Sequence, residues 1–160
     1  MKVVVISGYF NPIHTGHLDY IKAASALGDK LVVIVNNDKQ VELKGSKPFM
    51  NEFDRMRIVS AIKGVHKTTL SIDKNESVIE TLKSIYNEYA VDYFFDSMTF
   101  CNGGDRTRGN SPEEEYCEWR GIQTAYNVGG GKTQSSSAIL EDVADQSYHN
   151  LYRDGYREVK

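Results

Sequence analysis

The sequence lacks the long apolar runs and the cysteine pairs that mark membrane-spanning proteins and secreted, disulfide-bonded proteins. No apolar stretch approaches the roughly 18 residues that a membrane-spanning helix needs. The first residues, MKVVVIS, lead directly into an apolar run without the features of a signal peptide. Cys101 and Cys117 form no CxxC pattern and are interpreted as free thiols in a reducing compartment. These absences predict a cytoplasmic protein that does not bind a membrane.

The chain also lacks an excess of positive charge. Its 19 Lys and Arg residues against 22 Asp and Glu residues leave a net charge of −3. Nucleic-acid-binding proteins usually carry a basic surface, so we expect no nucleic-acid partner, although a local basic pocket for a nucleotide is compatible with this balance. With 160 residues, the chain is long enough for one domain with a sizeable core.

Short apolar runs rich in β-branched residues alternate along the chain with amphipathic helical patterns. A continuous run such as VVVI is typical of a strand buried on both faces of a parallel sheet. The alternation predicts an α/β fold, Rossmann-like, with three α/β/α layers and a five-stranded, mainly parallel sheet. The expected strands are 3–6, 30–36, 66–72, 91–96 and 122–128. The first expected helix begins near Thr15 or Gly16, and the later ones cover 52–63, 76–89 and 111–121.

Residues 1–142 are expected to form this domain. The remaining residues, 143–160, carry tyrosines at helical spacing and are expected to form a helical tail. We expect this tail to pack on the domain or on the partner subunit of a homodimer. Ligands in parallel sheets bind at the carboxyl ends of the strands, so the loops after the strands should face one cleft. The four loops in question are 7–15, 36–51, 97–110 and 129–135.

The first of these loops has the features of an anion site. Gly8 ends the strand pattern, and the helix begins near Thr15, which is a candidate N-cap. Unpaired N–H groups and the dipole at a helix N-terminus attract anions. His14 and His17 flank this start, and Gly16 lets a ligand approach the backbone between them. The alternative interpretations are a structural loop with two exposed histidines, or two ligands of a metal site.

The segment GYFNPIHTGH, residues 8–17, resembles the HxGH signature of the nucleotidyltransferase superfamily. That superfamily includes cytidylyltransferases for glycerol phosphate and choline phosphate, and adenylyltransferases for heptose phosphate, pantetheine phosphate and nicotinamide mononucleotide. The resemblance implies that His14 and His17 are catalytic and donate hydrogen bonds to a triphosphate. It also implies a set of nucleotide-binding residues in this segment, namely Gly8, Tyr9, Phe10, Asn11, Thr15 and Gly16.

The segment LKGSKP, residues 43–48, resembles the lysine loop that closes over the triphosphate in the same superfamily. This resemblance implies a catalytic role for Lys44 and nucleotide binding by Lys47. Arg55, on the next expected helix, matches an arginine that the family places near the nucleotide. The alternative is that the lysines are solvated and that Arg55 is an exposed helix arginine.

Two later segments extend the resemblance. The serines at 135–137 resemble the second signature of the superfamily, in which a helix N-terminus holds the triphosphate, and they also suit an N-cap. The stretch NGGDR, residues 102–106, resembles a GGD motif of the heptose-phosphate enzymes, and the alternative is a surface loop. The residues implied are Ser135, Ser136, Ser137, Gly104 and Asp105 for the nucleotide, and Arg106, Arg108 and Lys132 for the acceptor phosphate.

The sequence departs from the family pattern at two positions. Asn11 stands where glycerol-phosphate and choline-phosphate enzymes carry aspartate, whereas asparagine is found in the nicotinamide-mononucleotide type. Gly130 aligns with an arginine that normally precedes the serine signature. Lys132 and Arg106 are the candidates for supplying that charge. The sequence therefore does not decide which nucleotide and which acceptor the protein uses among these enzyme types.

The resemblance implies transfer of a nucleoside monophosphate, with CTP weakly favoured over ATP as the donor, to a phosphorylated polyol or sugar, with release of pyrophosphate. Mg²⁺, bound mainly through the triphosphate, is the expected cofactor, and no metal site of the protein itself is expected. The alternative of another class is a non-catalytic nucleotide-binding module. Class I aminoacyl-tRNA synthetases also carry HxGH, but this chain has no room for a tRNA-binding domain. His66 and His149 show no zinc-ligand spacing.

Overall fold

The computed structural model describes residues 1–103, 109 and 111–130. Five strands pair in parallel in the order β3-β2-β1-β4-β5. This arrangement confirms the predicted α/β fold with a five-stranded sheet. The elements in chain order are β1 (Lys2–Gly8), α1 (Thr15–Ser25), β2 (Lys30–Val35), α2 (Asp38–Leu43), α3 (Glu52–Ser60), β3 (Lys67–Leu70), α4 (Ile79–Ala90), β4 (Ser97–Cys101), α5 (Glu114–Arg120) and β5 (Gln123–Ala125).

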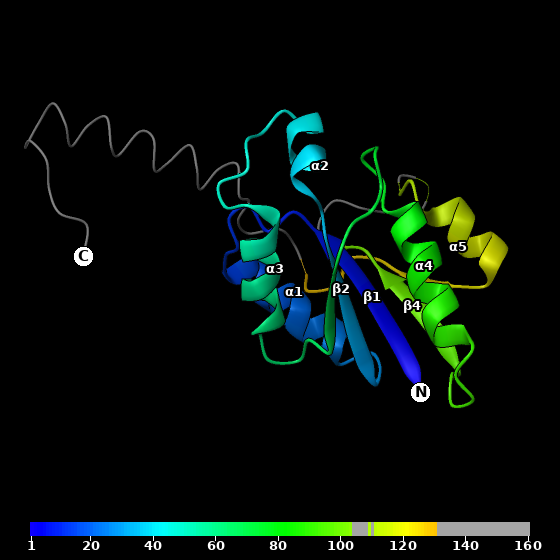
Figure 1. Cartoon of the computed structure of the whole chain (residues 1–160). Helices are drawn as coiled ribbons and strands as arrows, with labels where there is room; N and C mark the ends of the chain where they lie inside the picture. Colours follow the sequence, from blue (N-terminus) through cyan, green and yellow to red (C-terminus); the bar gives the residue numbers. More distant parts are fainter. Residues whose placement is uncertain (104–108, 110, 131–160) are drawn as a thin grey trace, which may run out of the picture.

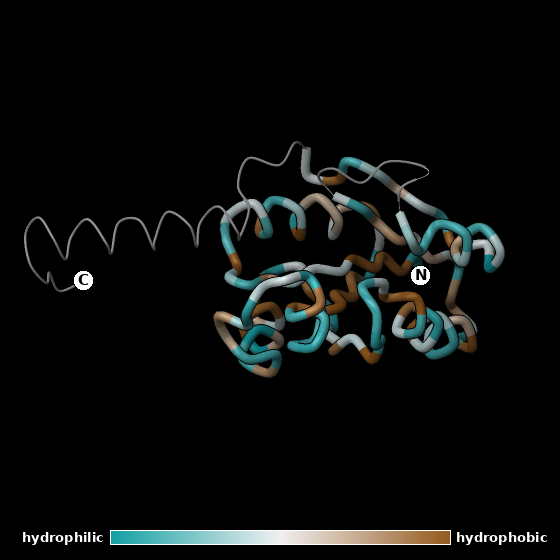
Figure 2. Tube along the Cα trace, turned by 90° about the horizontal axis from the view of Figure 1, so that it is seen from above, coloured by the Kyte–Doolittle hydropathy of each residue, from teal (hydrophilic) through white to brown (hydrophobic). Residues whose placement is uncertain are grey.

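The sheet is the middle of three layers, with α1 and α3 on one face and α4 and α5 on the other (Figure 1). Successive residues of a strand point to opposite faces. Val4 and Ile6 of β1 therefore pack with α1 and α3, while Val3 and Val5 pack with α4 and α5. All four side chains are buried, which explains the uninterrupted apolar run. Seen from above, hydrophobic residues lie between the two helical layers (Figure 2).

The strand order reverses beside β1, which has β2 on one side and β4 on the other. In open parallel sheets, a crevice forms at such a switch point, outside the carboxyl ends of the two strands. Here the switch point lies where the loop after β1 and the start of the loop after β4 leave neighbouring strands. The fold therefore places the HxGH segment, which directly follows β1, at the position where α/β proteins bind ligands.

The predicted strand at 91–96 is wrong, because the fourth strand is β4, one segment later. Val91 instead caps the C-terminus of α4, and the Asp92 N–H donates to the Tyr89 carbonyl in a tight turn. Tyr93 and Phe94 are then 92% and 71% exposed. The composition of residues 91–96 favours a strand. The segment that pairs with β1 is nevertheless 97–101, whose composition is less typical of a strand.

Residues 38–43, expected within a polar loop, form α2. Asn37 is its N-cap, and the side chains of Asn37 and Gln40 each accept a hydrogen bond from the other's backbone N–H. Gln40 is fully buried, and its amide also donates to the carbonyls of Asn75 and Ser77. Long-range contacts therefore stabilise a helix of six residues, which is too short to show a periodic pattern. The other elements predicted within the described residues exist with shifted ends.

No helix among the described residues is long and apolar enough to span a membrane. The predicted tail at 143–160 lies outside the described residues.

Candidate active site

The two histidines of the HxGH segment cap the N-terminus of α1. The N-cap is His14, not the predicted Thr15, and His14 has extended backbone geometry. Its Nδ1 accepts from the Gly16 N–H at 3.1 Å, and Nδ1 of His17 accepts from the His14 N–H at 3.1 Å. This is a capping box, in which imidazoles replace the usual serine and glutamate. The spacing of three residues thus has a structural cause.

The capping contacts also fix where each ring carries its proton. A neutral imidazole has one N–H and one acceptor nitrogen. Since Nδ1 of each ring accepts from a backbone N–H, the neutral forms of His14 and His17 are assigned their proton on Nε2. The rings stack with centroids 3.9 Å apart and planes inclined by 28°. The pair therefore combines two Nε2–H donors with the positive end of a helix dipole.

Close packing explains the small residues around the two rings. A Cβ on Gly16 would lie 2.8 Å from Cε1 of His14, so only glycine leaves room for that ring. The buried ring of Phe10 lies 4.8 Å from the His17 ring, between centroids. A Cβ on Gly8 would come within 2.8 Å of the Phe10 ring. Gly8 and Phe10, both predicted to bind the nucleotide, therefore support His17 in the structure.

The lysine loop lies against the HxGH segment. Lys44, at the end of α2, places its Nζ 4.4 Å from the centroid of the Tyr9 ring. Lys47 is exposed, and its carbonyl accepts from the side-chain amide of Asn11 at 2.8 Å. The loop after β2 thus contacts the loop after β1 through the Lys44 ammonium and the Lys47 backbone.

Arg55 is buried, unlike the exposed helix arginine considered as the alternative. Its side chain has no exposed surface. The guanidinium donates to the carbonyls of Tyr9 and Asn36 at 2.7 Å each and to the carbonyl of Met50 at 3.0 Å. It also pairs with the Asp38 carboxylate at 2.6 Å. In this arrangement Arg55 joins the loops that follow β1 and β2.

Tyr20 of α1 connects the loops on the other side of the switch point. Its hydroxyl donates to the Cys101 carbonyl at 2.7 Å, at the end of β4. A Cβ on Gly103 would lie 3.1 Å from the Tyr20 ring, and one on Gly129 would lie 3.0 Å from the Tyr20 Cα. Burial, with a smaller contribution from Cys101, raises the pKa of Tyr20 above its ordinary value. Sequence reasoning missed Tyr20, because nothing in a helical pattern marks one tyrosine as a contact between loops.

The described part of the chain thus brings together His14, His17, Lys44 and the loop from Gly8 to Gly16. It contains no cluster of three or more His, Cys, Asp or Glu side chains that could hold a metal ion. Several predicted site residues lie outside the described residues, namely Gly104, Asp105, Arg106, Arg108, Lys132, Ser135, Ser136 and Ser137.

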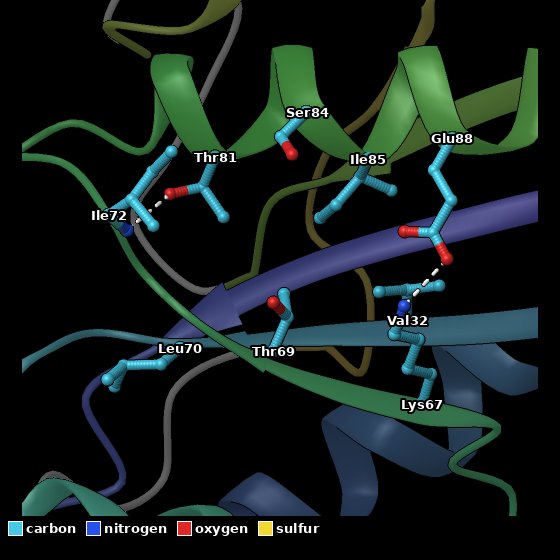
Figure 3. Close-up of a pocket in the computed structure, with 9 residues that line it drawn as sticks. All are labelled: Val32, Lys67, Thr69, Leu70, Ile72, Thr81, Ser84, Ile85 and Glu88. Atoms are coloured by element: carbon cyan, nitrogen blue, oxygen red, sulfur yellow. Dashed lines mark hydrogen bonds and ion pairs between the residues drawn. The ribbon is translucent and has the colours of Figure 1, made fainter.

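A separate small pocket lies between β3 and α4 (Figure 3). Thr69 and Ser84 line it, and the Lys67–Glu88 ion pair, 2.7 Å long, crosses one end. Its volume of about 50 Å³ is well below the size of sites for small organic ligands. None of the predicted site residues lines this pocket.

A family model described as cytidylyltransferase-like matches residues 5–137, which is most of the chain. The chain belongs to the cytidylyltransferase-like family. This membership confirms the predicted resemblance to the HxGH nucleotidyltransferases. The matched segment includes the capped histidines, the lysine loop and the serines at 135–137.

Among curated relatives of this cytidylyltransferase-like chain are archaeal FAD synthases. The chain is 40% identical over 97 residues to the FAD synthase of Ferroglobus placidus, covering 60% of this chain and 63% of the relative. It is 34% identical over 87 residues to that of Thermoplasma acidophilum, covering 53% and 61%. It is also 42% identical over 66 residues to the bifunctional protein HldE of Koribacter versatilis, covering 40% of this chain and 14% of the relative. The matches therefore span less than two thirds of each of these relatives.

Solved structures share the fold of this cytidylyltransferase-like domain. A lipopolysaccharide core biosynthesis protein from Thermoplasma volcanium superposes with a TM-score of 0.61 at 24% identity, covering 79% of this chain and 95% of that one. A bifunctional NMN adenylyltransferase/ADP ribose pyrophosphatase from Francisella tularensis gives a TM-score of 0.62 at 14% identity, covering 91% and 42%. At these identities the likeness concerns the fold alone.

Proposed function

We propose that the chain is a nucleotidyltransferase that transfers an adenylyl group from ATP to a phosphorylated small molecule. An oxygen of the acceptor phosphate attacks the α-phosphorus and forms a new P–O bond. The bond from the α-phosphorus to the bridging oxygen breaks, and pyrophosphate leaves with the bonding electron pair. The observation that carries this proposal is the capped start of α1, where two Nε2–H donors and a helix N-terminus meet at the switch point.

An acceptor phosphate is already ionised near neutral pH, so the reaction needs no general base. Catalysis then depends on holding the two reactants in line and on neutralising negative charge as it builds on the phosphates. In our proposal, His14 and His17 donate to triphosphate oxygens, and Lys44 and Lys47 add positive charge from the facing loop. Mg²⁺ belongs to this scheme as part of the triphosphate substrate.

The choice of ATP rests on the relatives. Archaeal FAD synthases that are 34–46% identical to this chain bear a name that implies a product with an adenylyl group. This favours ATP over the CTP that the sequence weakly favoured. The acceptor-binding roles of Arg106, Arg108 and Lys132, the nucleotide-binding serines and the homodimer remain predictions.

The test is pyrophosphate release with each of the four nucleoside triphosphates. Each triphosphate is paired with flavin mononucleotide, a hexose phosphate, a heptose phosphate or glycerol phosphate. We expect release with ATP and one class of acceptor. Release with CTP alone would overturn the adenylyl assignment. Binding of ATP without release for any acceptor in the panel would instead indicate a nucleotide-binding module.

A further inference from the structure

The side chain of Asn11 contacts the backbone of the lysine loop at two points. Its Nδ2 donates to the Lys47 carbonyl at 2.8 Å, and its Oδ1 accepts from the Phe49 N–H at 2.5 Å. The side chain is buried, with only 5% of the residue exposed. It thus pairs with the loop much as a neighbouring strand would, with one bond in each direction.

These contacts require an amide. The Lys47 carbonyl can only accept and the Phe49 N–H can only donate, so the Asn11 amide must present both functions in this orientation. An aspartate would keep the contact to Phe49 but would turn a carboxylate oxygen toward the Lys47 carbonyl. Two acceptors would then face each other in a buried position, which is unfavourable.

We call the two hydrogen bonds of the Asn11 side chain the clamp. The loop makes further hydrogen bonds on either side of it. The Ser46 N–H donates to the Val41 carbonyl of α2, and the Met50 carbonyl accepts from Arg55. Between these two attachments, the contacts of Asn11 hold residues 47–49 to the segment that carries the histidines. The side chains of Lys47 and Phe49 remain exposed.

We propose that Asn11 is a positioning residue, which holds the lysine loop against the HxGH segment before any ligand binds. This differs from the nucleotide contact that the family resemblance implies for Asn11. The consequence for binding rests on the proposed function. A loop that is already in place loses less conformational entropy when a triphosphate binds, so binding is tighter. The consequence for the free protein does not depend on the function.

Limited digestion with trypsin tests the clamp in the free protein. Trypsin cuts after Lys44 once the loop detaches, and mass spectrometry identifies that cut. Asn11→Ala removes both contacts and Asn11→Asp removes one, so we expect cutting after Lys44 to be at least tenfold faster in Asn11→Ala and several-fold faster in Asn11→Asp. Asn87→Asp, an exposed asparagine of α4, is the matched control and should cut at the wild-type rate. Equal cutting in all four proteins would overturn the clamp.

Steady-state kinetics test the second half of the proposal. In Asn11→Asp we expect KM for the triphosphate to rise about tenfold while kcat changes less than threefold. Faster cutting with unchanged KM would overturn the link between the loop and the triphosphate. If wild-type protein releases no pyrophosphate, the proposed function fails, whereas the digestion still decides whether Asn11 holds the loop. Thermal unfolding of each variant shows that the digestion reports the loop rather than global unfolding.

Discussion

At the scale of single residues, His14 and His17 each serve two purposes. One nitrogen of each ring caps α1, and the contact that this nitrogen makes determines that the other carries a proton. A donor formed in this way is held in place by the start of the helix, so it need not be ordered when an anion arrives. The structural and chemical contributions of one side chain can therefore be separated by substitution.

Replacing His14 by serine tests this separation. Serine is a good N-cap but has no imidazole, so the helix keeps its cap and the site loses a donor. We expect turnover to fall about 10²- to 10³-fold while the melting temperature stays within about 3 °C of wild type.

His14→Ala is the companion variant. It should lose the same turnover and, in addition, about 1 kcal/mol of unfolding free energy, because alanine cannot cap. Urea denaturation measures that difference. A folded His14→Ser protein with near-normal turnover would contradict the proposed role of the ring.

At the scale of elements, the chain builds its site by joining short segments through buried polar side chains. Arg55 lies on α3 but bonds the loop after β1, the end of β2 and the start of α2. These contacts give Arg55 a structural role, although it lies beside a site that contains another cation, Lys44. Its removal should therefore lower stability.

For Arg55→Ala we expect a loss of about 3–5 kcal/mol in the free energy of unfolding, since the Asp38 carboxylate and three backbone carbonyls lose their donor. Urea denaturation followed by circular dichroism measures it. Arg57→Ala, an exposed position on the same helix, is the control and should change stability by less than about 0.5 kcal/mol. Equal effects of the two substitutions would refute the structural role.

The position of Arg55 shows where sequence reasoning stops. Its partners Tyr9, Asn36 and Met50 are distant or unremarkable in sequence, so only tertiary structure reveals that Arg55 is buried. The parallel sheet and the position of the HxGH loop at the carboxyl end of its strand could be predicted, because they follow from local apolar runs and from the rule for parallel sheets. The strand predicted at 91–96 is wrong for a tertiary reason. The local composition favours a strand there, but it is residues 97–101 that pair with β1.

At the scale of the whole molecule, burial in the core favours the neutral forms of two cysteine thiols and one tyrosine hydroxyl. Burial raises the pKa of the Cys101 and Cys117 thiols to about 12 each, and it also raises the pKa of Tyr20. In the unfolded chain the thiols ionise near their ordinary value of about 9. The folded state therefore binds more protons above that pH.

It follows that the contribution of the two thiols to stability is steady below about pH 8.5 and falls as the pH rises from about 9 toward 12. Each thiol contributes a slope of up to about 1.4 kcal/mol per pH unit. Urea denaturation at pH 8, 9.5 and 10.5 measures this fall. A variant with alanine at both cysteines is the control and should show a shallower slope, and identical slopes would contradict the assignment.

The central position of β1 has a consequence for the order in which the protein folds. β1 pairs with β2, which follows it closely, and with β4, which lies almost a hundred residues later. Once residues 1–70 have been synthesised, β1, β2 and β3 can pair, but the other edge of β1 has no partner until β4 emerges. An unpaired edge on an apolar strand is prone to wrong association. The central strand of the finished sheet is therefore one of the last to be paired on both edges, and the same late pairing with β4 completes the switch point.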